Sequence, residues 1–158
     1  MCIRDRGTLA SELQTLGKYD KAEPPCREAL EVRRKTLGSR APDTLASINN
    51  LGMLLKAKGD LAAAEPLFRE ALEVSRETLG NRHPDTLSSI NNLGALLRAK
   101  GDLAAAEPLL REALEVRRET LGNRHPSTLA SIRGLGNLLK AKGDLAAAEP
   151  LLREAGVS

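Results

Sequence analysis

Residues 43–84 decide the fold of this chain. They read DTLASINNLGMLLKAKGDLAAAEPLFREALEVSRETLGNRHP, and the same 42 positions return almost unchanged at residues 85–126. The two stretches differ only at five aligned pairs, which are Ala46/Ser88, Met53/Ala95, Lys56/Arg98, Phe68/Leu110 and Ser75/Arg117. Similarity at a fixed period of this length indicates a repeat architecture, in which each unit buries its apolar side against its neighbours.

Further copies flank this pair. A third copy begins at Ser127 and breaks off after Ala155, and a diverged copy precedes the pair, where residues 16–24 align with residues 58–66. We therefore expect one repeat domain over residues 7–155, divided into 7–42 (partial and diverged), 43–84, 85–126 and 127–155 (truncated).

Both ends of the sequence depart from the repeat. Arg6 falls on the core column of Ile48, where an unpaired charge is costly to bury. Because residues 1–6 also resemble the translation of a sequencing-library adapter, we predict that they are a non-native scar. Residues 156–158 are expected to form an irregular end. Neither end carries a polar capping helix, so we expect apolar end faces that favour self-association.

Each copy has the pattern of two helices. In the first helix, Leu45, Ile48, Leu51 and Leu55 recur at spacings of three and four, which places them on one helical face. Glycine recurs in the same helix at one column, occupied by Gly52, Gly94 and Gly136. Glycine inside a helix costs about 1 kcal/mol relative to alanine. Its repetition therefore predicts the close approach of a neighbouring helix.

The turns between the helices carry their own signals. Gly59 suits the left-handed position that ends a helix, and Asp60 suits the N-cap of the helix that follows. Gly80 ends that second helix, and Pro84 fits the first turn of the next one. The apolar face of the second helix consists of Leu61, Ala64, Phe68, Ala71 and Leu72.

The composition favours packed helices over a sheet. Apolar residues make up 41% of the chain, and Tyr19 and Phe68 are its only aromatic residues, so the core is aliphatic. Strands favour aromatic and β-branched residues, whereas Ala and Leu have the best helix propensities. Pattern and composition together predict an all-α fold.

Charge, hydropathy and cysteine content exclude several functional classes. The net charge is +3 with both signs interspersed, and without aromatic stacking residues this argues against nucleic-acid binding. No apolar run approaches the roughly 18 residues of a membrane span. Cys26 is interpreted as a reduced, core-facing residue, which favours a cytoplasmic setting. His83 and His125 lie in turns without a second ligand at metal spacing, so we expect turn or capping roles and no metal or cofactor.

The repeat resembles the tetratricopeptide repeat. Its small and apolar signature falls at Ile48, Leu51, Gly52, Leu55, Gly59, Leu61, Ala64, Phe68 and Ala71. The 42-residue period and the Leu-Gly-Asn-Arg-His-Pro turn resemble more specifically the kinesin-light-chain type. The resemblance implies a right-handed α-solenoid of antiparallel helix pairs. In this superhelix the first helices line a concave groove, which family members use to hold short peptides of partner proteins.

The resemblance also implies which residues face that groove. They are Asn49, Asn50, Met53 and Lys56 in the first full copy, Asn91, Asn92, Ala95 and Arg98 in the second, and Arg133, Gly134, Asn137 and Lys140 in the third. Asparagine side chains bond both donors and acceptors of a peptide backbone, and Lys and Arg favour carboxylates. We therefore hypothesise a groove for a peptide with acidic residues. The alternative is an ordinary solvated helix face.

Three functional hypotheses follow. The leading one is a scaffold for protein–protein interaction that binds a partner peptide in the groove. The second is a regulatory sensor arm of a larger multidomain signalling protein. The third is a structural spacer without a specific ligand, which near-identical copies would suit. An enzyme is the least favoured interpretation, because Ser, Asp and His occur only as repeated columns, which duplication explains better than catalysis.

Overall fold

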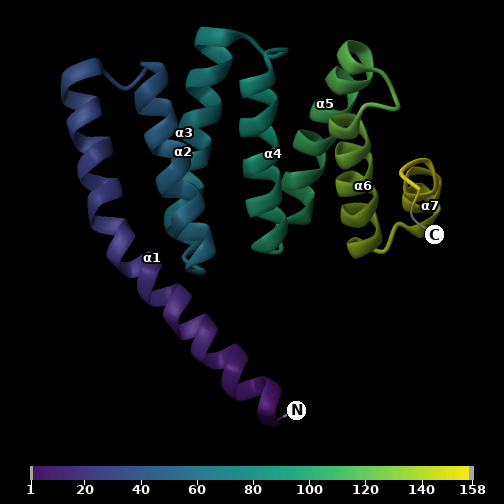
Figure 1. Cartoon of the computed structure of the whole chain (residues 1–158). Coiled ribbons are helices and arrows are strands. Elements are labelled where there is room, and N and C mark those ends of the chain that lie inside the picture. The colour runs from purple at the N-terminus through teal and green to yellow at the C-terminus, as the bar shows by residue number, and fades with distance from the viewer. Residues whose placement is uncertain (1, 157–158) are drawn as a thin grey trace. The chain divides into compact units, whose positions relative to one another are not determined.

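The computed structural model describes residues 2–156, and within this range the side chains of residues 16–156. The described residues form helices and no strand (Figure 1), which confirms the all-α prediction. The helices are α1 (Cys2–Leu37), α2 (Pro42–Ala57), α3 (Leu61–Leu79), α4 (Pro84–Ala99), α5 (Leu103–Leu121), α6 (Pro126–Ala141) and α7 (Leu145–Glu154). Met1 of the expected scar and residues 157–158 of the expected irregular end lie outside the described residues.

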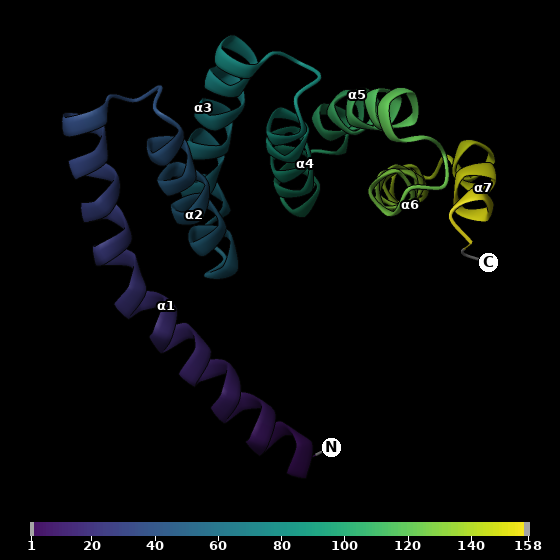
Figure 2. The same ribbon diagram turned by 45° about the horizontal axis from the view of Figure 1, so that its top comes forward.

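The chain forms two compact units, residues 1–74 and 75–158, and α3 runs from the first into the second. In the first unit α1 packs on α2. In the second unit α4 packs on α5, α5 on α6 and α6 on α7 (Figure 2). Helices that follow one another along this part of the chain therefore also pack on one another. This succession is what a stack of helix pairs requires.

The turn inside each helix pair confirms the expected signals. Gly59, Gly101 and Gly143 have φ values of 89°, 87° and 88°, in the left-handed region that glycine adopts without strain. At the start of α5, the Asp102 carboxylate accepts a hydrogen bond from the Ala105 backbone N–H at 3.3 Å. The aspartates before α3 and α7 make the same contact. An N-cap of this kind contributes about 1 kcal/mol.

The turn between successive pairs uses proline and histidine. Pro84 and Pro126 are the first residues of α4 and α6, where a missing backbone N–H does no harm. The Nδ1 atom of His83 accepts from the Asp85 N–H at 3.0 Å. His125 accepts from the Ser127 N–H at 3.1 Å in the same way. The expected capping role of the two histidines is thus confirmed.

The glycine column lies where two helices approach most closely. A Cβ atom built on Gly52 would lie 2.9 Å from the Phe68 ring, and one on Gly94 would lie 2.9 Å from a methyl group of Leu110. On Gly136 the corresponding distance to the Leu152 side chain is 2.8 Å. These distances are shorter than van der Waals contact. Glycine therefore lets each first helix approach the second helix of its own pair.

Ion pairs join successive second helices, a feature that the sequence pattern did not indicate. In the first unit Arg34 donates two hydrogen bonds to Glu70, at 2.5 and 2.8 Å. In the second unit Arg76 donates to Glu112 at 2.6 and 2.8 Å. Arg118 donates to Glu154 at 2.5 and 2.9 Å. Each pair therefore has two parallel hydrogen bonds, which add a defined geometry to the attraction between the opposite charges.

These pairs predict an acid-sensitive component of stability. Hydrogen bonding to Arg76 lowers the pKa of Glu112 below its ordinary value of 4.5. A carboxylate whose pKa is depressed by folding stabilises the protein above its unfolded pKa, and that contribution is lost as pH falls through the folded pKa. We expect Glu112→Gln to lower stability at pH 7 by at most about 1 kcal/mol, because the pair is partly exposed. Denaturant titrations at pH 7 and pH 3 should show this difference shrinking in acid.

The matched control for this prediction is Glu115→Gln. Glu115 lies exposed on the same helix, and its replacement should change stability less at pH 7. Equal effects of the two substitutions at pH 7 would show that the Arg76–Glu112 pair adds nothing.

The first helix departs from the pattern of the others. Gly17 aligns with Gly59, but α1 continues through it without a turn and with Pro24 and Pro25 inside the helix. Gly17 is not among the glycines with positive φ. One local difference lies one residue further on, where Lys18 stands in the column of Asp60, the residue that caps α3. A lysine side chain has no acceptor atom, so this stabilising cap is lost at that position.

Candidate functional site

The expected groove residues lie on the first helices of the pairs, with different exposure. On α2, Asn50 and Met53 are exposed, whereas Asn49 and Lys56 are half-buried. On α4, Ala95 and Arg98 are exposed and Asn91 and Asn92 are half-buried. On α6, Arg133 and Lys140 are exposed, and Gly134 and Asn137 are half-buried. None of the expected positions lies in the fully buried core of the described residues.

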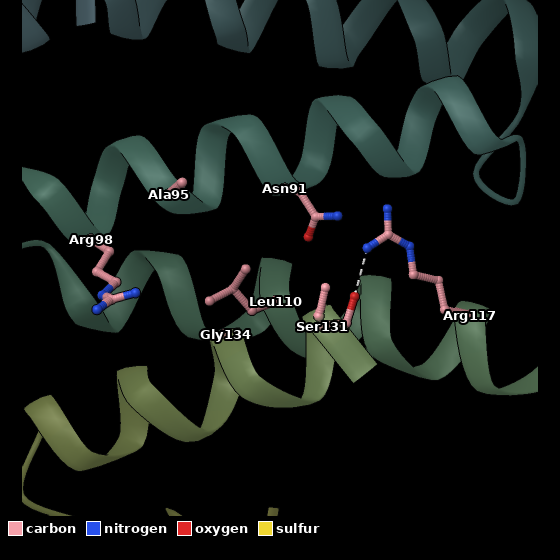
Figure 3. Close-up of a pocket in the computed structure, with 8 residues that line it drawn as sticks. Asn91, Ala95, Arg98, Leu110, Arg117, Ser131 and Gly134 are labelled. Atoms are coloured by element: carbon pink, nitrogen blue, oxygen red, sulfur yellow. Dashed lines mark hydrogen bonds between the residues drawn. The ribbon is translucent and has the colours of Figure 1, made fainter. Parts of the chain in front are cut away.

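The second unit contains a pocket of about 280 Å³ between α4, α5 and α6. Its lining residues are Asn91, Ala95 and Arg98 from α4, Leu110 and Arg117 from α5, and Ala130, Ser131 and Gly134 from α6. Figure 3 shows the Arg117 guanidinium directed toward Asn91 and Ser131. The pocket therefore brings together three expected residues of α4 and Gly134 of α6, and it adds Arg117 from a second helix. Asn92, Arg133, Asn137 and Lys140 do not line it.

Arg117 is the central polar group of this pocket. Its Nη1 donates to the Ser131 hydroxyl at 2.7 Å and, more weakly, to the Ser127 carbonyl at 3.4 Å. With its carboxamide oxygen turned toward α5, Asn91 accepts from Nη1 at 2.7 Å and from Nη2 at 2.8 Å. This orientation of the amide is the one that satisfies both hydrogen-bonding partners.

The hydrogen-bond partners of Arg117 in the described part of the chain are all neutral groups. Burial lowers the pKa of its guanidinium, although an arginine stays charged in proteins. No carboxylate forms an ion pair with Arg117 among the described residues, whereas Arg76 and Arg118 each have a glutamate. None of the eight lining residues is acidic. The pocket is therefore electropositive, with Arg98 as its second charged group.

The first unit repeats part of this arrangement. Arg33 aligns with Arg117 and donates to the Ser47 hydroxyl at 2.6 Å and to the Asp43 carbonyl at 3.0 Å. The aligned residue of the intervening copy is Ser75, which carries no guanidinium. Asn49, the counterpart of Asn91, has a buried carboxamide oxygen without a hydrogen-bond partner among the described residues.

A signal for Arg117 was present in the sequence. Ser75/Arg117 is one of the five differences between two otherwise identical copies. The other four differences leave the charge of their columns unchanged, so a column in which the charge differs marks a place where the copies differ in chemistry. Arg117 is not among the expected groove residues, because all of those lie on first helices and Arg117 reaches the pocket from α5.

The polar side chains of the pocket are groups that form hydrogen bonds with a ligand. Within the described part of the chain, no cluster of three or more His, Cys, Asp or Glu side chains is placed to hold a metal ion. No helix among the described residues is long and apolar enough to cross a membrane. The polar groups that face the pocket are an amide, a hydroxyl and two guanidinium groups, which suit recognition of a backbone or an anion.

Comparisons with known proteins agree with this architecture. The tetratricopeptide repeat model matches the chain over residues 6–77, 45–119 and 85–155. No curated protein matches the sequence. Two crystal structures of a Podospora anserina protein of kinesin-light-chain type with nearly identical TPR-like repeats, one of them a point variant, superpose with a TM-score of 0.83 at 29% identity. Each alignment covers 97% of this chain and 72% of the other.

A third solved structure extends the similarity. The crystal structure of BtubC (BKLC) from P. vanneervenii superposes with a TM-score of 0.81 at 27% identity. The alignment covers 89% of this chain and 56% of that protein. These similarities confirm the predicted solenoid fold class and the kinesin-light-chain-like type of the repeat.

Proposed function

Because the chain belongs to the tetratricopeptide repeat family, whose repeats generally mediate protein–protein interaction, we propose that it is a scaffold that holds a partner peptide against its first helices. The observation that supports this most is the pocket between α4, α5 and α6, with its amide, hydroxyl and guanidinium groups. Its walls are helices of a packed unit, so little conformational entropy is lost when a peptide binds.

The charges of the pocket favour an acidic residue in the bound peptide. Arg117 has only neutral hydrogen-bond partners, so a carboxylate would supply the counter-charge that burial of a guanidinium calls for. Arg98 adds a second positive group at the pocket wall. Asn91, already bonded to Arg117, has its amide N–H groups left to donate to a peptide carbonyl.

The experiment compares two arginines of α5. Arg117→Ser introduces the residue that the preceding copy carries as Ser75, so the change is compatible with the repeat. We expect it to weaken binding of an acidic peptide, selected from a labelled peptide array, by about tenfold, the value of one charged hydrogen-bonding contact of 1.4 kcal/mol. The control is Arg111→Ser, which removes the same charge from an exposed position of the same helix.

Two readouts decide the proposal. Fluorescence titration at low and high salt should show affinity for acidic peptides that falls with salt and depends on Arg117 but not on Arg111. Binding without preference for acidic peptides would remove the electrostatic part of the proposal. An array on which no peptide binds would favour the structural spacer instead.

A further inference from the structure

The differences between the two near-identical copies gather at the pocket of the second unit. Residues 43–84 and 85–126 differ at five of 42 columns. The pocket takes five lining residues from the second of these copies, and four of them stand in differing columns, namely Ala95, Arg98, Leu110 and Arg117. Five differences scattered by chance over 42 columns would place on average fewer than one in those five lining columns. The two copies have therefore diverged chiefly in the residues of this pocket.

Two of the four differences give the pocket smaller walls. Ala95 stands in the column of Met53 and lacks the heavy atoms that end a methionine side chain. Leu110 stands in the column of Phe68, so a branched chain replaces a ring. On the α6 side Gly134 has no side chain, whereas both preceding copies carry an asparagine in its column. A Cβ atom built on Gly134 meets nothing within 4 Å. Each of the three helices thus contributes a residue smaller than an aligned one.

The other two differences introduce guanidinium groups. Arg98 replaces a lysine of the preceding copy, and Arg117 replaces a serine. In Figure 3 the two arginines lie at opposite ends of the pocket, with Leu110 and Gly134 between them. A guanidinium binds a carboxylate through two parallel hydrogen bonds, a geometry that an ammonium group does not offer. The pocket therefore has an apolar middle and a positive charge at each end.

The packing of the repeat does not require the smaller residues. A Cβ atom on Gly52 would lie as close to the Phe68 ring, at 2.9 Å, as one on Gly94 would lie to Leu110. Phe68 is 1% exposed, so the first unit buries the larger side chain. Met53 is 56% exposed, so its size does not burden the core. Because the fold accepts the larger residues, the reason for the smaller ones lies in the pocket that they leave open.

We propose that Ala95 and Leu110 determine the specificity of this site, because they admit a bulky apolar side chain of the partner peptide next to the acidic residue that Arg117 binds. This role rests on the scaffold function proposed above, since it concerns the same peptide. The side chain packs against Ala95, Leu110 and Gly134 and is thereby removed from water. Selection of the partner then depends on the size of pocket residues as well as on charge.

The test restores the larger residues of the preceding copy and leaves both arginines in place. The variant is Ala95→Met/Leu110→Phe. The probes are fluorescein-labelled peptides Gly-Ser-Glu-Xaa-Glu-Ser-Gly, with alanine or leucine as Xaa, titrated by fluorescence anisotropy at low salt. We expect the unaltered chain to bind the leucine peptide about tenfold more tightly than the alanine peptide, because further carbons leave water. In the double variant the ratio of the two affinities should fall to about one, because the space for the leucine is filled.

Three further variants separate the parts of the site. Ala95→Met alone changes an exposed position and should lower the affinity ratio in the same direction. Ala99→Met adds the same side chain to an exposed position of α4 that does not line the pocket, and should keep the ratio of the unaltered chain. Arg117→Ser should weaken the binding of both peptides to a similar extent, so that their ratio persists. Thermal melts followed by circular dichroism check that each variant is folded.

Two distinguishable outcomes would overturn this role. In the first, both peptides bind through Arg117, but leucine gives no advantage or keeps its advantage in the double variant. The scaffold for acidic peptides would then stand, and the assignment of specificity to Ala95 and Leu110 would be wrong. In the second, neither peptide binds the unaltered chain at about 1 mM, which is weaker than the weakest specific affinity expected. The scaffold function would then fail, and the specificity role with it.

Discussion

Replacement of Leu93 by alanine is expected to destabilise the second unit by about 2–5 kcal/mol, the range for truncation of a buried leucine. Leu93 lies on α4 and is 2% exposed. The loss has two parts, the transfer free energy of the removed methyl groups and the cavity that a packed interior does not refill. Urea titration followed by circular dichroism measures it as a lower midpoint with an unchanged slope.

The control for this prediction is Leu121→Ala at the end of α5. Leu121 is 44% exposed, so the same atoms are removed from a place that water already reaches. We expect a much smaller change. If both substitutions lowered the midpoint equally, the assignment of Leu93 to the core of the repeat would be wrong.

The turns could be predicted from the sequence because each depends on a few adjacent residues. A glycine with φ near +88° and an aspartate that caps the next helix act within one turn of chain. At α1 the column alignment pairs Gly17 with the turn glycine Gly59, but the structure has no turn at Gly17. The residue beside it, Lys18, lacks the capping group of Asp60.

Interactions between copies were harder to predict. The Arg76–Glu112 pair joins residues 36 positions apart, a spacing that no rule for a single helix contains. Only the stacking of one second helix beside the next brings them together. Similarly, Arg117 enters the candidate site from α5, and its importance depends on the missing carboxylate, which only a spatial arrangement reveals. The groove residues themselves remain a prediction about function that binding experiments must test.

The repeats also explain why one column tolerates no side chain while a nearby one does. Gly94→Leu is expected to destabilise by about 1–3 kcal/mol or more, as overpacking does. A Cβ atom at Gly94 already lies 2.9 Å from Leu110, so the added isobutyl group must displace α5 from α4. Gly134→Leu on α6 is the control, because a Cβ atom there meets nothing within 4 Å. It replaces a poor helix former by a good one and should raise stability by up to about 1 kcal/mol.

The opposite signs of these two changes make the comparison decisive. Thermal melts of the two variants should move in opposite directions from the unaltered chain. If both variants melted at a higher temperature than the unaltered chain, helix propensity, and not the approach of α4 to α5, would govern the glycine column. In that case the close approach of the two helices would no longer explain why glycine recurs at 42-residue intervals, nor why the bulky Leu110 lies opposite Gly94.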